Sequence, residues 1–331
     1  MQPLATATRL RILLGRLLFD NFWVILGFFG RMHPLTMARI WGLRRTRNIA
    51  YGQEDPAQRL DIWQPLPTGE PRPVLLYIHG GAFRILSKDS HWLMAIRFAI
   101  RGYVVVNINY RMAPKHRFPA AVQDAALALH WLHAHIADYG GDPNCVVFAG
   151  ESAGGNIVTA LMLACCFVRP DAFARDVFAL GLVPRAVLPA CAVLQLTDPH
   201  RFHQLEPDLW SLLQDRLDEL PGDYLGETAP TDSTFFDPIL LLESEVLPDR
   251  PLPPIFAGCG TADPLWHDTV RLGKALLKRG VVHRTQLYPK QFHAFHAMVS
   301  GKAVRQYWRD QFAFLETVGL PAKRLRHKPL T

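Results

Sequence analysis

The chain has few cysteines, and their arrangement does not suit a fold held together by disulfides. Five cysteines occur among 331 residues, and Cys165 and Cys166 are adjacent, where two cysteines rarely bridge each other. Secreted domains that depend on disulfides carry a denser and more regular set. The sequence therefore predicts a reduced protein of cytoplasmic type, in which the cysteines are small buried apolar side chains.

No apolar run near the N-terminus is long enough to cross a membrane. The run FWVILGFFG at residues 22–30 follows Asp20 and Asn21 directly, whereas a spanning helix needs about 20 apolar residues. Small residues of a signal-peptide cleavage site are also missing. We expect an amphipathic helix that either packs on the protein or makes weak peripheral contact with an anionic membrane. The expected location is cytoplasmic, with this membrane contact as the open alternative.

The sequence also lacks motifs for nucleic acids, phosphates and dinucleotides. Its net charge of +7 is concentrated at the two ends of the chain, but no zinc-finger or RNA-binding signature accompanies it. No glycine-rich phosphate loop or dinucleotide fingerprint is present. No acid or cysteine at metal-binding spacing accompanies His130, His133 and His135, or His200 and His203. We expect no nucleic-acid partner, no cofactor and no metal. We assign these histidines to solvent-exposed helix surfaces.

From residue 73 onward, strands and helices alternate regularly. Apolar runs typical of buried strands occupy residues 73–80, 103–110, 145–150, 186–196, 253–260 and 283–288, and helical spacing marks 90–102, 120–143, the segment after 153, 266–279 and the segment after 300. This alternation favours an α/β protein with a mainly parallel central sheet and helices on both faces.

Residues 196–250 interrupt the alternation between two predicted strands. They contain prolines, aspartates and a leucine-rich helix on which Trp210, Leu213, Leu217 and Leu220 share a face. The segment is too long for an ordinary connection. We expect a single domain over residues 1–331, in which residues 196–250 and the first fifty residues form a helical lid over the ends of the strands.

The motif GESAGG at residues 150–155 follows the predicted strand CVVFAG directly. Gly-x-Ser-x-Gly between a strand and a helix is a nucleophile elbow, a turn so tight that only glycine fits on either side of the serine. The turn lifts the Ser152 hydroxyl above the sheet, and the N-terminus of the next helix offers N–H groups to an anion. Ser152 is therefore the candidate nucleophile.

A serine nucleophile needs a base and a site for the oxyanion. The motif HGGAF at residues 79–83 ends a predicted strand. Its consecutive glycines let the N–H groups of Gly80 and Gly81 point into a site without obstruction by side chains. A plain glycine turn is the alternative, but the elbow elsewhere in the chain favours an oxyanion hole.

These motifs resemble the hormone-sensitive lipase family of α/β-hydrolases, which includes many bacterial carboxylesterases. The likeness covers about residues 45–320 through HGGAF, YRMAPKHRFPAAVQDA at 110–125, GGDP before GESAGG, GTADPL at 260–265 and HAF at 293–295. Glu151, Lys115 and Ala294 stand where the family more often has other residues, and none of them replaces a catalytic group. The resemblance implies the α/β-hydrolase fold.

The resemblance also implies the roles of individual residues. Ser152 would be the nucleophile, and Asp263 in GTADPL would orient the base. The N–H groups of Gly80, Gly81 and Ala153 would form the oxyanion hole. The order Ser, Asp, His along the chain is the one that this fold requires.

Two histidines in QFHAFHAM, residues 291–298, compete for the role of base. His293 falls in the loop beyond the predicted strand 283–288, where a base must lie, whereas His296 comes a turn later, near the start of the final helix. The family's His-Gly-Phe also matches the sequence at His293 and not at His296. We predict that His293 is the base and His296 is not. Asp263 follows its strand directly, while Asp268 lies in the next helix and is expected at the surface.

These features predict a serine carboxylic ester hydrolase that acts on short to medium acyl esters through an acyl-enzyme. The modest size of the predicted lid is the reason for expecting short to medium acyl chains. An amidase or deacetylase would use the same three residues. Plant hormone receptors that resemble this family bind ligands on the same fold without catalysis, but they have lost a member of the triad, which this chain keeps.

Overall fold

The computed structural model describes residues 34–66, 69–209, 211–227 and 233–320, and the isolated positions 13, 15, 17, 21, 25 and 324. Apart from Ile25, the amphipathic helix expected at residues 22–30 lies outside the described residues, and so does Trp210. No helix within the described part of the chain has both the length and the hydropathy needed to span a bilayer.

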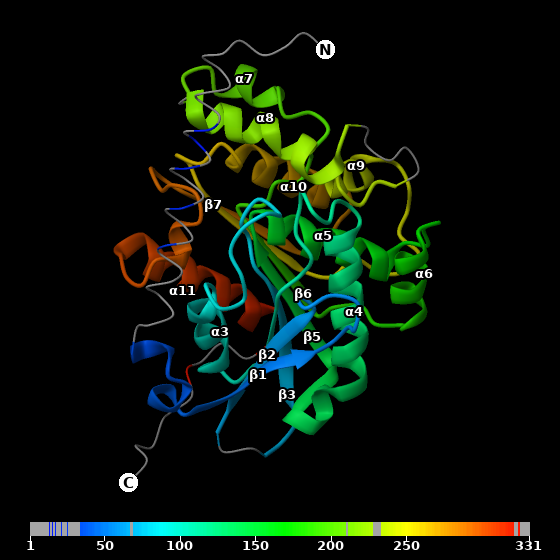
Figure 1. The fold of residues 1–331 in the computed structure, drawn as a ribbon, viewed down its shortest axis with the longest axis vertical. Coiled ribbons are helices and arrows are strands. Elements are labelled where there is room, and N and C mark those ends of the chain that lie inside the picture. The colour runs from blue at the N-terminus through cyan, green and yellow to red at the C-terminus, as the bar shows by residue number, and fades with distance from the viewer. Residues whose placement is uncertain are drawn as a thin grey trace.

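An eight-stranded sheet in the order β1-β2-β4-β3-β5-β6-β7-β8 runs through the molecule (Figure 1). The strands are β1 Leu43–Ala50, β2 Arg59–Pro65, β3 Arg72–Ile78, β4 Val104–Ile108, β5 Gly141–Glu151, β6 Ala186–Ala190, β7 Ile255–Gly260 and β8 His283–Tyr288. Strands β3 to β8 pair in parallel, whereas β2 is antiparallel to both of its neighbours. The predicted α/β class with a mainly parallel sheet is confirmed.

Strand β1 shows that the predicted lid was wrong for residues 43–50. This segment pairs with β2 at the edge of the sheet. Half of its residues are exposed and it is rich in arginine, so no apolar pattern marks it as a strand, and such charged residues are typical of sheet edges. Its Arg45 donates a 2.8 Å hydrogen bond to the buried Asp61 of β2, whose other oxygen lies 2.9 Å from Lys88. Charged side chains that are distant in the sequence therefore join β1 to its neighbours, beside the backbone pairing.

Helices cover both faces of the sheet. They are α3 Trp92–Ala99, α4 Ala120–His135, α5 Ala153–Cys166, α6 Ala172–Ala179, α10 Trp266–Lys278 and α11 Lys302–Thr317. Alternate residues of β3 point to opposite faces: Val74 and Leu76 join the apolar core under α4 and α5, and Leu75 and Tyr77 join the core under α3 and α11. Figure 1 shows these two pairs of helices on opposite sides of the strands.

The segment between β6 and β7 contains α7 Arg201–Leu205, α8 Ser211–Leu225 and α9 Pro238–Glu243. We call residues 196–250 the insertion. Figure 1 shows α7 and α8 together at one end of the molecule, at the top of the view and far from β1. The predicted strand 186–196 is shorter than expected, because Cys191, with a positive φ of 36°, ends it after Ala190.

Candidate active site

Ser152 is the single residue between β5 and α5. Strand β5 ends at Glu151, and α5 begins at Ala153. The backbone of Ser152 has φ 53° and ψ −119°, a strained conformation for a residue with a Cβ atom. A Cβ at Gly150 would lie 2.4 Å from the carbonyl oxygen of Gly154, so the turn closes too tightly for any residue except glycine there. The structure thus gives Ser152 the geometry of a nucleophile elbow.

The loop after β3 brings Gly80 and Gly81 against this turn. The Nδ1 of His79 donates a 2.7 Å hydrogen bond to the carbonyl oxygen of Gly80. Burial lowers the pKa of His79 to about 3, so its imidazole is neutral. Because the C=O and N–H of a trans peptide point in opposite directions, this bond directs the Gly81 N–H away from His79. A Cβ at Gly81, where φ is 109°, would lie 2.1 Å from the Ile85 carbonyl oxygen, so only glycine fits.

The N–H groups predicted for the oxyanion hole have no backbone acceptor among the described residues. In the described part of the chain, neither Gly80 nor Gly81 donates its N–H to a backbone acceptor. Ala153 is the first residue of α5, so its N–H has no acceptor within the helix. A Cβ at Gly80 would lie only 3.3 Å from the Ser152 Cβ, which shows how closely this loop approaches the elbow.

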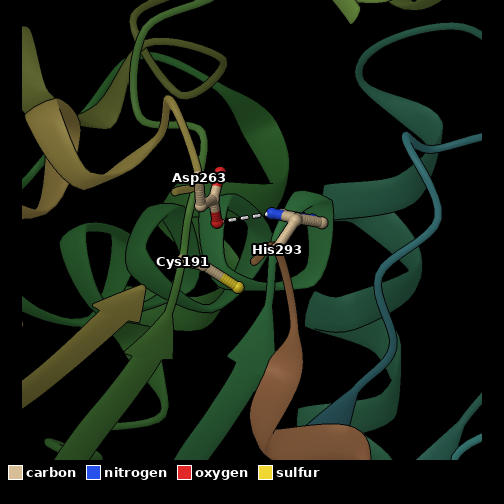
Figure 2. Close-up of side chains that lie close together, drawn as sticks. All are labelled: Cys191, Asp263 and His293. Atoms are coloured by element: carbon tan, nitrogen blue, oxygen red, sulfur yellow. Dashed lines mark hydrogen bonds and ion pairs between the residues drawn. The ribbon is translucent and has the colours of Figure 1, made fainter. Parts of the chain in front are cut away.

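His293 and Asp263 form a direct pair at the ends of β8 and β7. The Nδ1 of His293 lies 2.7 Å from Oδ2 of Asp263 (Figure 2). The other carboxylate oxygen accepts the Leu265 N–H at 3.0 Å, and the Cys259 thiol donates to Oδ2 at 3.3 Å. Because a carboxylate accepts hydrogen bonds, Nδ1 of His293 carries a proton, and in the neutral imidazole Nε2 is left as an acceptor.

The surroundings of His293 favour its protonated form. Burial alone would lower its pKa, but Asp263 and then Cys191 raise it, and the pKa lies well above the ordinary 6.5. A base becomes an imidazolium once it has taken a proton, and the buried carboxylate stabilises that form. The pair is therefore suited to accept a proton from a hydroxyl.

Ser152, Asp263 and His293 line one cavity of about 300 Å³. Most of the other lining residues are apolar, and the Leu213, Leu217 and Leu220 face of α8 forms one wall. Ser152 and His293, both fully described, share no direct hydrogen bond in this structure. Such bonds are often long without substrate and shorten in the substrate complex.

The cavity also contains two arginines, each already paired with an acid. Arg84 forms an ion pair with Asp223, and Arg216 lies 2.5 Å from Glu219. All four residues belong to the loop after β3 or to α8. These pairs compensate the positive charge of the arginines, so we do not expect these two side chains to attract an anionic substrate.

A buried polar cluster that we did not predict lies behind Ser152. Oε1 of Glu151 accepts a 2.5 Å hydrogen bond from Nε2 of His91, and Oε2 lies 3.2 Å from Nε2 of His296. Tyr77 donates to the same Oε2 at 3.4 Å. Burial would raise the pKa of Glu151, but His91 and His296 hold it well below the ordinary 4.5. An ionised carboxylate therefore joins the elbow to two distant loops.

The structure separates the two histidines of the HAFHAM segment. His296 lies in a short 3-10 helix, Phe295–Ala297, and its side chain is 4% exposed. Its ring stacks on Tyr307 with 4.6 Å between centroids, and its carbonyl oxygen accepts the indole N–H of Trp308 at 3.0 Å. His293 faces the cavity, while His296 is enclosed behind it. The final helix, α11, starts at Lys302, which confirms the helix predicted after residue 300.

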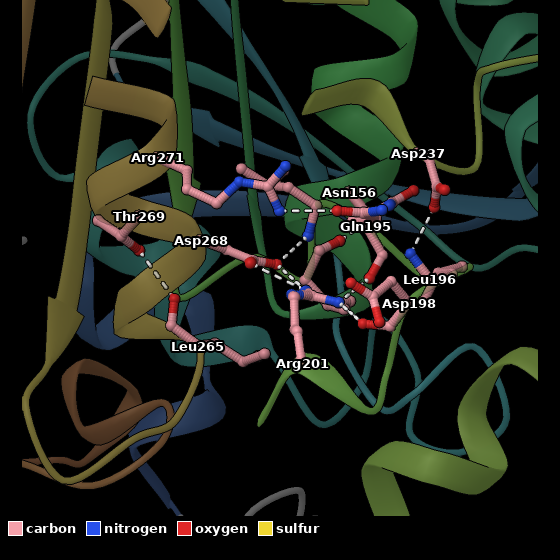
Figure 3. A network of polar contacts seen from close by, with 12 residues as sticks. Asn156, Gln195, Leu196, Asp198, Arg201, Asp237, Leu265, Asp268, Thr269 and Arg271 are labelled. Atoms are coloured by element: carbon pink, nitrogen blue, oxygen red, sulfur yellow. Dashed lines mark hydrogen bonds and ion pairs between the residues drawn. The ribbon is translucent and has the colours of Figure 1, made fainter. Parts of the chain in front are cut away.

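The prediction for Asp268 is wrong, because this residue is completely buried. It lies in the first turn of α10, where Oδ2 accepts the Leu194 N–H at 2.8 Å and pairs with Arg201 of α7 at 2.7 Å (Figure 3). Arg201 also donates to the Gln195 carbonyl oxygen at 2.9 Å. The partner is 67 residues away, so local spacing did not reveal it. This network anchors the start of the insertion beside the catalytic loops.

Two groups of side chains within the described residues have the donor types of a metal site. One is Cys191 with Asp263 and His293, and the other is His200 and His203 with Asp218. The second group corrects the expectation that no acid accompanies these histidines, since Asp218 lies 2.8 Å from Nε2 of His203. His200 and His203 are exposed, as predicted.

Comparisons with known proteins agree with this geometry. A family model described as alpha/beta hydrolase fold matches residues 75–297. Carboxylesterase NlhH of Mycobacterium tuberculosis is 30% identical over 234 residues, which are 70% of this chain and 69% of NlhH. Esterase LipC of the same organism is 40% identical over 114 residues, which are 34% of this chain and 28% of the length of LipC.

A solved structure shows the same fold. Esterase LipW from Mycobacterium marinum superposes with a TM-score of 0.73, covering 91% of this chain and 90% of that chain at 21% identity. The strand order, the elbow between β5 and α5 and the matched family model point to one conclusion. The chain belongs to the α/β-hydrolase fold family, within its hormone-sensitive lipase group.

Proposed function

We propose that the protein is a serine carboxylesterase that cleaves short to medium acyl esters through an acyl-enzyme. The observation that carries the proposal is the 2.7 Å contact between His293 and Asp263, in a cavity that Ser152 also lines from its strained turn. Nucleophile, base and orienting acid come from three loops that follow β5, β8 and β7. This is the constellation that acyl transfer requires.

In the proposed reaction, Oγ of Ser152 attacks the ester carbonyl while Nε2 of His293 takes the hydroxyl proton. Asp263 keeps Nδ1 protonated and stabilises the imidazolium that forms. His293 then gives the proton to the leaving alcohol. A water molecule, activated by the same base, attacks the acyl-enzyme and releases the acid.

The negative charge of each tetrahedral intermediate is assigned to the N–H groups of Gly80, Gly81 and Ala153. Two of these donors come from the loop after β3, and the third from the N-terminus of α5. Loss of one such donor lowers kcat about 10²–10³-fold in other serine hydrolases. The glycines are needed because a Cβ at Gly81 would collide with the Ile85 carbonyl group.

We propose that the insertion acts as a lid and sets the acyl-chain length. Its helix α8 contributes an apolar wall to the cavity. A volume of about 300 Å³ is at the small end of ligand pockets, which favours acyl groups of modest length. The pairing of both described cavity arginines with acids also suits an alkyl chain better than an anionic substituent.

A panel of p-nitrophenyl esters from acetate to palmitate, with the matching anilide of the best acyl group, tests the proposal. We expect the highest kcat/KM for short or medium chains, slower turnover of palmitate and much slower cleavage of the anilide. Faster palmitate cleavage at equal solubility would contradict the chain-length proposal. Preference for the anilide would favour an amidase, and no turnover of any substrate would favour a ligand-binding role.

We also propose a cytoplasmic location, with weak and reversible contact between anionic membranes and the N-terminal arm, the segment that contains the predicted amphipathic helix at residues 22–30. All five cysteines are free thiols, as suits a reducing compartment. The sequence of the arm combines Phe22, Trp23, Ile25 and Phe29 with several arginines. Apolar side chains and basic residues together are the combination that binds a membrane surface.

A further inference from the structure

A third side chain with metal-binding chemistry lies beside the proposed acid and base. The sulfur of Cys191, a carboxylate oxygen of Asp263 and an imidazole nitrogen of His293 all lie within 4.8 Å of one another. Cys191 directly follows β6 and is 1% exposed. Figure 2 shows its sulfur pointing toward the His293 loop, on one side of the hydrogen bond between His293 and Asp263. The proposed reaction has no use for a thiol at this place.

Thiolate, imidazole and carboxylate together form a donor set that zinc prefers. A tetrahedral Zn²⁺ ion with bonds of about 2.0–2.3 Å places its ligand atoms about 3.3–3.6 Å apart. The 2.7 Å contact between Asp263 and His293 would open to this distance, and the sulfur would approach from within 4.8 Å. These changes require side-chain rotations of the three residues. A thiolate ligand also selects against Mg²⁺ and Ca²⁺, which prefer oxygen ligands.

The substrate cavity provides the route by which a cation reaches these atoms. Asp263 and His293 line the cavity, and the His293 side chain is 36% exposed. Cys191 lies behind them, away from solvent. A cation that enters the cavity therefore meets the imidazole and the carboxylate first, and the thiol completes the set of three.

We propose that Cys191, Asp263 and His293 form an inhibitory site for a thiophilic divalent cation, with Zn²⁺ as the representative ion. Binding releases the thiol proton to solvent and places the ion on Nδ1 of His293. The proton of Nδ1 moves to Nε2, which then has no lone pair to accept the Ser152 proton. Ester hydrolysis stops as a result. The inhibitory consequence rests on the proposed function, whereas the binding itself does not.

Inhibition by zinc is the first test. The full-length protein, stripped with a chelator and kept reduced with a phosphine, is assayed on p-nitrophenyl butyrate at buffered free Zn²⁺ concentrations. We expect inhibition that added chelator reverses and that Mg²⁺ does not reproduce. Loss of an outer contact to a metal ligand already weakens binding about 10–100-fold. Cys191→Ala, compared with its own metal-free rate, should therefore need at least about tenfold more Zn²⁺ for half inhibition.

Two further variants serve as matched controls. Cys259 is equally buried and also contacts Asp263, but its sulfur is not in the group of three ligands. Cys259→Ala should keep the wild-type sensitivity to Zn²⁺. His203→Ala disrupts the other three-ligand group within the described residues. This variant should also keep the wild-type sensitivity to Zn²⁺. Equal inhibition of wild type and Cys191→Ala, or loss of inhibition in His203→Ala, would overturn the proposal.

Cobalt spectroscopy tests the site without any catalytic readout. A thiolate bound to Co²⁺ produces a charge-transfer band in the near ultraviolet. This band should appear on titration of the wild type and of Ser152→Ala, and should be absent from Cys191→Ala. Its absence from Ser152→Ala would overturn the metal site. A band in a protein that hydrolyses no ester would instead leave the metal site standing and refute the proposed function.

Discussion

His293 and His296 are three residues apart, and each meets a buried acid, yet their surroundings differ completely. His293 lies 2.7 Å from Asp263, and its side chain is 36% exposed toward the cavity. His296 lies 3.2 Å from Glu151, and its side chain is 4% exposed and stacked on Tyr307. A histidine–acid pair is therefore not enough to make a base. The second nitrogen must also reach the substrate.

The acids of the two regions differ in the same way. Asp263 has one histidine partner and leaves the far side of that ring free. Glu151 has His91 on one oxygen and His296 on the other, so the charge is enclosed between two rings. The first arrangement suits proton transfer. The second suits the joining of loops, because it links the elbow to the start of α3 and to the loop that carries His293.

The largest effect is expected from Ser152→Ala, which removes the group that both regions surround. Removal of the nucleophile in serine hydrolases lowers kcat by about 10⁶-fold. The fold should persist, since the strained backbone of this turn does not depend on the hydroxyl. Activity on p-nitrophenyl butyrate and the thermal unfolding midpoint check both statements. Full activity in a folded variant would refute the assignment of the nucleophile.

The next effect comes from matched substitutions of the two acids. Asp263→Asn should lower kcat by about 10⁴-fold, because an amide no longer favours the required tautomer of His293. Glu151→Gln should keep most of kcat and instead destabilise the protein by about 1–3 kcal/mol, since a buried hydrogen-bonded charge is lost. Kinetics and denaturant unfolding of both variants decide. A large loss of kcat in Glu151→Gln, with an unchanged kcat in Asp263→Asn, would show that the two roles are the reverse of those assigned.

A pH profile sharpens the description of the His293 region. The neutral imidazole is the active form, and Asp263 holds the pKa of His293 above 6.5. Activity should therefore be lost as pH falls through that raised pKa, with kcat/KM dropping about tenfold per pH unit on the acid side. Measurement from about pH 5 to 10 locates the midpoint, which we expect above 6.5. A plateau that continues to about pH 5.5 would contradict the stabilisation by Asp263.

The smallest effect concerns the N-terminal arm, far from this comparison in the sequence. Sedimentation with anionic vesicles at low salt should recover part of the protein, and a high-salt wash should release it, because the attraction to lipid headgroups is screened. Trp23→Ala should weaken the binding, and neutral vesicles serve as the control. Failure to bind anionic vesicles at low salt would exclude the contact.

The features that the sequence predicted well are those fixed by neighbouring residues. The turn at Ser152 requires glycines within a few positions, and Gly81 requires its own backbone conformation, so each leaves a local motif. Parallel strands with helices between them likewise produce a periodic apolar pattern. Fold class could be read from the sequence for this reason.

The features that escaped prediction depend on partners far along the chain. Glu151 meets His91 at a separation of 60 residues, and Asp268 meets Arg201 at 67. Strand β1 is defined by its pairing with β2 and by ion pairs of Arg45, which leave no periodic apolar pattern in the sequence. Charges can pair across the fold without any local signature, so an acid within a helix, such as Asp268, was taken for a surface residue.

The most direct test of the contrast between the two histidines replaces each with alanine and compares kcat on one short-chain ester. His293→Ala should lose nearly all activity, about 10⁴-fold or more, because the base is gone. His296→Ala should keep most of its kcat and show its main effect as a lower unfolding midpoint. The reverse result, an active His293→Ala and an inactive but folded His296→Ala, would contradict the account.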